Sequence, residues 1–361
     1  MNEHGRDLDR RQFLAASAGA VAAAMVSGGR VAAAPPEPRI VVARGGAKMP
    51  ADEAAYTRLK AALDKLGGFD ALVKGKRVLA KINGTDQKIQ DANTSTSLTA
   101  AVLRLCKERG AGSVAVLGQE WYGYDCPRAG QPTLREVIKA AGVELIELLH
   151  WWQRTDQYAK HVPKAGGWKE LYVAKAIFEP DTVLLNVPRL KTHAFTLYTG
   201  CVKNIIGLTH HMYGFHCESD RDPEAGKSDQ HPSRVRGWVR FPGKLSAAYH
   251  EVFRERIALN ILDAGEPTFG WGGPKSEQCR TFPANAVIVG PDALACDAYG
   301  MRLLHEREPK LIPEALADWT QGDGIYVQSN LTKSNYLAEC QKLGAGQADL
   351  SKVKIDEVAV D

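Results

Sequence analysis

Short apolar runs alternate along this chain with stretches in which apolar residues recur every three or four positions. The runs have the length of buried strands, and the amphipathic stretches have the period of helices that cover a sheet. We expect strands at residues 39–42, 77–82, 113–117, 143–148, 181–187, 257–262 and 286–289. We expect helices at residues 52–66, 97–109, 133–141, 245–256 and 292–305.

The order of these elements indicates the fold class. Strand and helix signals follow one another in a β-α-β rhythm, which is typical of a parallel sheet with right-handed crossovers. We therefore predict an α/β fold with a largely parallel sheet flanked by helices. The chain shows no internal repeat and no low-complexity linker, so residues 34–361 are expected to form a single domain.

The regular pattern stops between residues 208 and 243. This segment is rich in His, Arg, Asp, Pro and Gly and has no clear apolar period. Segments of that length inside a compact domain are commonly lids or binding loops. We predict a long irregular His-rich insertion that covers a site.

The first 33 residues have the features of an export signal. Arg10 and Arg11 form a twin-arginine motif, and an Ala- and Gly-rich apolar run follows at residues 15–26. The run is shorter than the roughly 20 residues of a membrane span. Residues 1–33 are therefore predicted to be a twin-arginine signal peptide, cleaved after Ala33. The mature protein is expected to be periplasmic or extracellular, exported already folded by the twin-arginine translocation machinery, with no transmembrane segment.

Charge and cysteine spacing exclude several classes of partner and cofactor. The net charge of +4 is nearly balanced over 361 residues and gives no reason to expect a nucleic-acid partner. The seven cysteines include no C-x-x-C pair, so we expect neither an iron–sulfur cluster nor a zinc ribbon. No phosphate-binding P-loop, dinucleotide fingerprint or serine nucleophile elbow is present.

The densest candidate chemistry follows the strand at residues 181–187. Its members are Arg189, Lys191, His193, Thr199, Gly200, Lys203 and Asn204. Ligands of open α/β sheets lie beyond the carboxyl ends of strands, and cations beside an imidazole suit an anionic ligand and proton transfer. The segment after Gly200 is predicted to turn into a short helix, whose backbone amides and Lys203 would hold a carboxylate or phosphate.

Other expected strand ends carry further candidates. Lys81 and Asn83 end the strand at 77–82, and Asp263 follows the strand at 257–262. Asp292 and Asp297 follow the strand at 286–289. Two of these have a structural alternative that stays open, since Asp263 is also suited to an Asx-turn and Asp292 to a helix N-cap. Asp297 lies on a mostly apolar helix, where a buried carboxylate needs a partner.

A second cluster consists of histidines with one cysteine. His210, His211, His216 and Cys217 are residue types that bind transition metals, and we retain them as a candidate metal site. Their spacing matches no zinc signature. The alternative is a solvent-facing lid that contributes acid–base groups, and a transition-metal cofactor stays an open option.

Several segments in this order resemble the DUF362 family of uncharacterised proteins. They are residues 81–83 (KIN), 188–193 (PRLKTH), 199–207 (TGCVKNIIG), 259–264 (LNILDA) and 290–298 (GPDALACDA). The resemblance extends over about residues 40 to 305. It implies that these segments form one site, and it implies no particular reaction.

Our leading hypothesis is an exported α/β enzyme that acts on a small anionic molecule. Lys81, Lys191 and Lys203 would bind and polarise the anion, and His193 would act as general acid or base. Three carboxylates would orient His193 or complete a metal site, namely Asp263, Asp292 and Asp297. The alternative hypothesis is a non-catalytic periplasmic protein that binds a metal or another ligand.

Overall fold

The computed structural model describes residues 38–119, 123–149, 155–193, 197–210, 215, 232–269, 279–309 and 336–361. The predicted export signal at residues 1–33 lies outside these stretches, as do His211, His216 and Cys217 of the candidate metal set. None of the helices in these stretches combines the length and apolar character that crossing a membrane requires.

One sheet of eleven strands runs through the described part of the chain. Its main path has the order β13 (Lys354–Val360), β1 (Arg39–Gly45), β12 (Ala286–Gly290), β10 (Ile257–Phe269), β7 (Thr182–Val187), β2 (Arg77–Ile82), β3 (Ser113–Gln119) and β4 (Glu144–Leu148). Along this path only β12 runs antiparallel to its neighbours. The prediction of a largely parallel sheet is confirmed.

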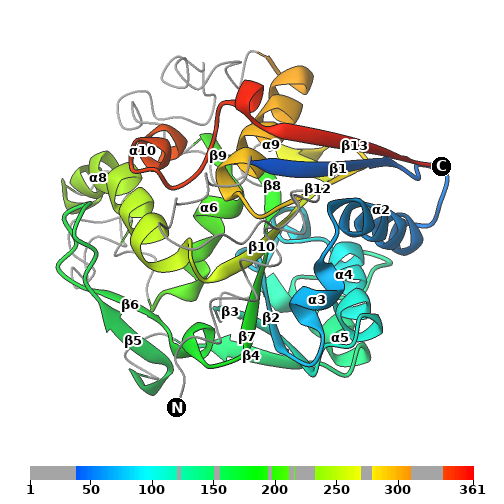
Figure 1. The fold of residues 1–361 in the computed structure, drawn as a ribbon, viewed down its shortest axis with the longest axis horizontal. Coiled ribbons are helices and arrows are strands. Elements are labelled where there is room, and N and C mark those ends of the chain that lie inside the picture. Colours follow the sequence, from blue (N-terminus) through cyan, green and yellow to red (C-terminus); the bar gives the residue numbers. More distant parts are fainter. Residues whose placement is uncertain are drawn as a thin grey trace, which may run out of the picture.

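Helices cover both faces of the sheet (Figure 1). One face carries α2 (Ala51–Leu66), α3 (Phe69–Val73), α4 (Thr96–Glu108) and α5 (Leu134–Ala140). The other face carries α6 (Cys201–Asn204), α8 (Pro232–Ala248), α9 (Ala293–Arg307) and α10 (Tyr336–Lys342). Consecutive residues of β2 alternate between the two cores, since Val78 and Ala80 face α2 and α4 while Leu79 faces the other layer. Burial on both faces explains why β2 is a continuous apolar run.

The stretch after β7 is a strand, where the sequence analysis placed a polar segment beyond the strand end. Pro188 separates β7 from β8 (Arg189–His193). β8 pairs with the second half of the long strand β10. β9 (Leu197–Thr199) returns antiparallel to β8. All five residues of β8 are buried, although three of them are basic. Because side chains alternate along a strand, Arg189, Lys191 and His193 share one face of β8.

The prediction of an irregular segment over residues 208–243 is wrong for its last part. Helix α8 already begins at Pro232, and a π-helical turn at Tyr249–Phe253 continues it. Pro242 lies inside α8 and lacks the amide hydrogen that a helix interior uses. Tertiary packing outweighs this local cost, because Phe241 and Leu245 are buried in the core on the α6 side.

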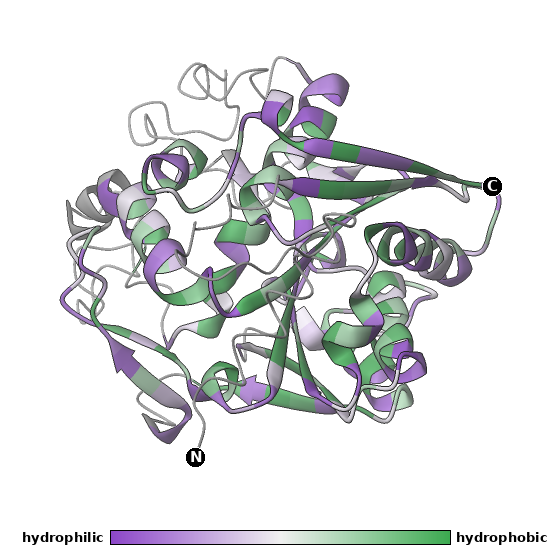
Figure 2. Cartoon of the chain, in the orientation of Figure 1, coloured by the Kyte–Doolittle hydropathy of each residue, from purple (hydrophilic) through white to green (hydrophobic). Residues whose placement is uncertain are grey.

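Two strand pairings had no counterpart in the sequence prediction. The C-terminal strand β13 pairs in parallel with β1 along its whole length. It is an edge strand in which apolar and polar residues alternate, as Figure 2 shows by its alternating colours. A small antiparallel pair also forms from β5 (Tyr158–His161) and β6 (Leu171–Ala174).

Candidate functional site

The candidate site lies where the sheet changes the direction of its connections. The chain leaves β2 through α4 toward β3, on one face of the sheet. It leaves the adjacent strand β7 through α6 and α8 toward β10, on the other face. Connections that diverge from neighbouring parallel strands leave a crevice at the carboxyl ends of those strands, which is the usual ligand position in open α/β sheets.

Three lysines are buried in this region. Lys81 of β2, Lys191 of β8 and Lys203 of α6 are 3%, 0% and 6% exposed. A lysine is rarely buried to this extent, because an ammonium group loses its hydration inside the protein. We call these three residues the lysine cluster. All three are predicted site residues, and they lie on elements that meet at the carboxyl ends of β2 and β7.

Lys81 is held by amide and carbonyl oxygens. Its Nζ donates to Asn204 Oδ1 over 3.1 Å and to the carbonyl of Ile82. Burial lowers the pKa of Lys81 to about 7. Gly207 permits this position, because a Cβ there would lie 2.7 Å from Lys81 Nζ. A small cavity of about 20 Å³ reaches Lys81 at the carboxyl ends of β2 and β3.

Lys191 contacts the loop that follows β2. Its Nζ donates to Asn83 Oδ1 over 3.0 Å, to Thr85 Oγ1 over 3.2 Å and to the carbonyl of Ala92. Burial holds the pKa of Lys191 well below its usual value, and the opposing effect of Asp86 is smaller. The ammonium group of Lys191 therefore links β8 to the segment between β2 and α4.

Lys203 has the least polar surroundings of the three lysines. Its Nζ lies 5.6 Å from the ring centre of Phe241 on α8, in a cation–π arrangement. Among the residues that the structure describes, Lys203 has neither a hydrogen-bond acceptor nor a carboxylate partner. Burial holds its pKa well below the usual value, and the nearby charge of Lys191 lowers the pKa further.

A chain of asparagine side chains supports the cluster. Asn204 accepts from Asn83 over 3.2 Å and donates to Asn186 over 2.8 Å. Asn186 in turn donates to Asn260 over 2.8 Å. The sequence analysis assigned no role to Asn186 or Asn260. Both residues could have been identified from the sequence. Each is a lone amide inside an apolar strand, and a buried amide needs hydrogen-bond partners.

Asp297 is bonded within the fold, which differs from its predicted catalytic role. Its carboxylate accepts from the amides of Cys201 and Val202 over 2.6 and 3.0 Å, and from the Tyr198 hydroxyl over 3.0 Å. The first amides of α6 were expected to hold a ligand, and they hold Asp297 of α9 instead. Gly200 makes room for this contact, since a Cβ there would lie 2.3 Å from Asp297 Oδ1. Burial raises the pKa of Asp297 to about 6, although these donors lower it.

Asp292 is the N-cap of α9, one of the two alternatives for this residue. Its Oδ1 accepts from the amides of Leu294 and Ala295 over 2.8 and 3.1 Å. Its Oδ2 accepts from the amide of Gln347 over 2.8 Å, which fixes the segment before β13. These bonds engage both oxygens of Asp292 within the fold, which favours the helix N-cap over the predicted ligand-binding role.

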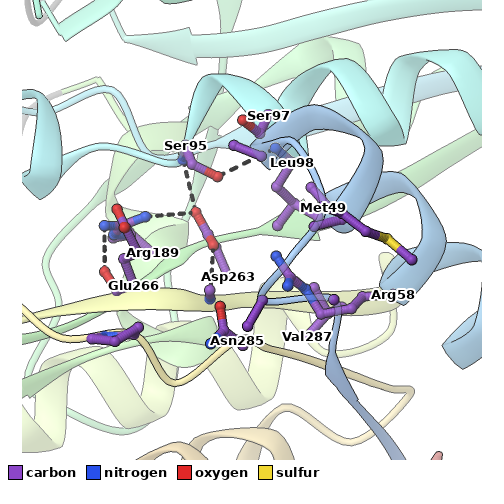
Figure 3. Close-up of a pocket in the computed structure, with 17 residues that line it drawn as sticks. Met49, Arg58, Ser95, Ser97, Leu98, Arg189, Asp263, Glu266, Asn285 and Val287 are labelled. Atoms are coloured by element: carbon purple, nitrogen blue, oxygen red, sulfur yellow. Dashed lines mark hydrogen bonds and ion pairs between the residues drawn. The ribbon is translucent and has the colours of Figure 1, made fainter. Parts of the chain in front are cut away.

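Arg189 and Asp263 form a buried ion pair beside the lysine cluster. The two side chains are each 2% exposed, and Arg189 Nη1 lies 3.1 Å from Asp263 Oδ2. The same oxygen accepts from the amide of Ser95 over 2.7 Å, and Arg189 Nη2 donates to the carbonyl of Glu266. The pair lines a separate pocket next to α2 and α4 (Figure 3).

The described histidines lie in two different settings. His193 is 5% exposed and shares a strand face with Lys191, as the acid–base hypothesis requires. His210 packs edge to face against the rings of Tyr172 and Tyr158, at 4.9 and 6.2 Å between centroids. In the stretches covered by the structure, no group of three His, Cys, Asp or Glu residues is arranged to hold a metal ion. The metal hypothesis involves His211, His216 and Cys217, so it stays a prediction.

Sequence and structure comparisons bear on the family of the chain. A crystal structure of a Thermotoga maritima protein from the Northeast Structural Genomics Consortium is similar over 71% of this chain and 58% of its own, with 15% identity and a TM-score of 0.43. The chain thus spans less than two thirds of that protein. No protein with a curated function matches the sequence.

The family model described as "Domain of unknown function (DUF362)" matches residues 78–302. This match covers more than half of the chain and includes the lysine cluster, the asparagine chain and the Arg189–Asp263 pair. The protein therefore belongs to the DUF362 family.

Proposed function

We propose that this protein is an enzyme that binds a small anionic molecule at the lysine cluster and transfers a proton to or from it. The observation that supports this most strongly is that two buried lysines have no carboxylate partner. Lys81 and Lys203 are buried, and in the described stretches neither contacts a carboxylate. A buried charge without a counterion is costly, and an anionic ligand would relieve that cost.

The lowered pKa values suit proton transfer. A lysine with a pKa of about 7 is divided between its ammonium and amine forms at neutral pH, so Lys81 can donate or accept a proton there. An ordinary lysine is almost entirely protonated at this pH and is a poor base. His193, on the same face of β8 as Lys191, would be the second acid–base group.

Anion binding and protonation are coupled at such a site. A bound anion favours the ammonium form and raises the pKa of Lys81, so binding takes up a fraction of a proton at neutral pH. Affinity for the anion should therefore fall as the pH rises through about 7. A site built from ordinary lysines would lose affinity only near pH 10.

We propose further that the protein acts outside the cytoplasm, because residues 1–33 have the pattern of a twin-arginine signal. The alternative is a periplasmic protein that binds the same anion without turnover. An activity measurement separates the two. Proton exchange at carbon can be followed by NMR in D₂O across a panel of small carboxylates and phosphate esters.

The decisive variants are Lys81→Met and Lys203→Met, because Met keeps most of the side-chain volume and removes the charge. Each should lower the exchange rate and the anion affinity about tenfold or more, since charge-assisted hydrogen bonds are lost. Lys342→Met is the control, because that lysine is 70% exposed. Unchanged exchange in folded Lys81→Met and Lys203→Met proteins would refute the proposal. Binding without any exchange would support the binding-protein alternative.

A further inference from the structure

A second pocket lies beside the lysine cluster, at the carboxyl end of β1 and against the middle of β10. It has a volume of about 470 Å³, which is in the range of roughly 300 to 1,000 Å³ found for small-molecule sites. Its walls come from the start of α2, the start of α4, β8 and β10. Figure 3 shows Arg58 extending from α2 into this pocket, across from Asp263.

Arg58 is a buried cation with unsatisfied donors. It is 6% exposed, and its one hydrogen bond within the described part of the chain runs from Nη1 to the carbonyl of Gly45 over 2.7 Å. Its Nε is buried and has no partner among the residues that the structure describes. Its Nη2 faces Gly265, where a Cβ would lie 3.6 Å away, so the absence of a side chain there leaves this nitrogen open to the pocket.

The nearest acid does not neutralise Arg58 by direct contact. Asp263 Oδ2 is already bonded to Arg189 and to the amide of Ser95. Asp263 and Glu266 raise the pKa of Arg58, but burial has the larger effect and lowers it. Glu266 lies at the rim, half exposed, with Arg128 at 3.7 Å. The pocket thus offers an available guanidinium beside the Asp263 carboxylate. Within the described stretches, the only hydrogen bond of Asp263 Oδ1 is a long one of 3.4 Å from the amide of Gly265.

Two helices begin at the wall of this pocket. α2 starts after Pro50 without a side-chain cap, and Ala51 lines the pocket. α4 starts after Ser95, whose hydroxyl accepts from the amide of Leu98, so the amides of Thr96 and Ser97 remain for a ligand, and Ser97 lines the pocket. The first amides of a helix have no intrahelical acceptor and carry partial positive charge, so both helix starts favour an anion.

We propose that this pocket binds a phosphate monoester of a small hydroxylated molecule. The phosphate would accept from Arg58 and from the first amides of α2 and α4, which together supply donors for more oxygens than a carboxylate has. The hydroxyl groups would donate to Asp263 Oδ1. Arg189 is a positioning residue, because its ion pair fixes the Asp263 carboxylate. The proposal concerns a different cavity from the lysine cluster, and it stands without the proton-transfer chemistry proposed above.

Calorimetric titration of the purified chain with glycerol 3-phosphate and with inorganic phosphate tests this proposal. We expect both to bind, and glycerol 3-phosphate to bind more tightly because of its hydroxyls. Arg58→Met should weaken binding about tenfold or more. Gly265→Val should block binding without removing a charge, because its Cβ would lie 3.6 Å from both Arg58 Nη2 and Asp263 Oδ1 and its methyl groups would fill the space beside them.

The controls separate this site from the lysine cluster. Arg104→Met removes an arginine of α4 that is 61% exposed and should leave the affinity unchanged. Lys203→Met should leave the binding that Arg58→Met removes unchanged, so failure of this proposal and failure of the proposed enzymatic function give different results. The proposal is overturned if wild-type protein binds neither compound at about 10 mM. Unchanged affinity in either Arg58→Met or Gly265→Val also overturns it, and Gly265→Val decides if Arg58→Met does not fold.

Discussion

Two buried charged regions of this protein differ in how their charges are satisfied. At the junction of α6 and α9, the carboxylate of Asp297 accepts from two backbone amides and a tyrosine hydroxyl. In the lysine cluster, the ammonium of Lys203 faces an aromatic ring and has no acceptor within the described stretches. Burial is nearly complete in both regions, so burial alone does not mark a functional site. A missing partner does mark one, because a buried group whose hydrogen bonds are satisfied within the fold needs no ligand.

The largest effect is expected at the junction of α6 and α9. Asp297→Ala leaves two amides and a hydroxyl without an acceptor, and the free energy of unfolding should fall by about 3 kcal/mol or more. Urea denaturation followed by circular dichroism measures this. Asp349→Ala is the control, because Asp349 also caps a helix start but is partly exposed. A loss below about 1 kcal/mol would show that the junction does not depend on this carboxylate.

A pH effect should distinguish the lysine cluster. Between about pH 7 and 10.5 the unfolded chain keeps the proton on Lys81 that the folded protein has released. Stability should therefore rise with pH across this window, by up to about 1.4 kcal/mol per pH unit, relative to Lys81→Met. Denaturation curves of the two proteins at a series of pH values provide the measurement. If the free energies of unfolding of the two proteins change with pH in the same way, the lowered pKa of Lys81 is contradicted.

The asparagine chain should contribute an intermediate amount. Asn204→Ala removes bonds to Lys81, Asn83 and Asn186, and should lower the free energy of unfolding by about 2 kcal/mol. It should also lower the pKa of Lys81 further, because Asn204 Oδ1 accepts a hydrogen bond from the charged form. Denaturation gives the first quantity and NMR titration the second. A higher pKa of Lys81 in this variant would contradict the assigned role of Asn204.

The smallest effect should have the opposite sign. Lys203→Met replaces a buried amine, which has no hydrogen-bond acceptor within the described stretches, with an apolar side chain, so the free energy of unfolding should rise by about 1 kcal/mol. The same variant is expected to lose anion binding. Higher stability together with lost binding is the combination expected of a functional group held at a cost to the fold. A variant that is less stable than wild type would indicate that Lys203 serves the fold, as Asp297 does.

Strand ends were predictable because apolar runs mark buried parallel strands. The position of Lys81 at the carboxyl end of β2 followed from that pattern, since parallel strands place their carboxyl ends at one edge. β8 was not predicted, because its three basic residues resemble a solvated loop and are buried only by tertiary contacts. β13 was missed because it is a half-exposed edge strand.

Side-chain partners could be predicted from the sequence less well than strand positions. The carboxylate of Asp297 meets amides almost a hundred positions earlier in the chain, and no local pattern reports that contact. Arg58 was missed because an arginine on an amphipathic helix is usually exposed. A signal did exist, since Arg58 follows Ala54 and Ala55 by one helical turn and therefore lies on the buried stripe of α2.

The most direct test of the account is the ionisation of the lysine cluster itself. NMR titration of ¹⁵N-labelled lysine side chains, assigned with Lys81→Met and Lys203→Met, gives the pKa of each amine with and without added malonate. We predict a pKa of about 7 for Lys81 in the free protein and a rise on adding malonate. An ordinary lysine pKa, near 10.4 and unchanged by the anion, would contradict the central claim that the lysine cluster is a buried anion site.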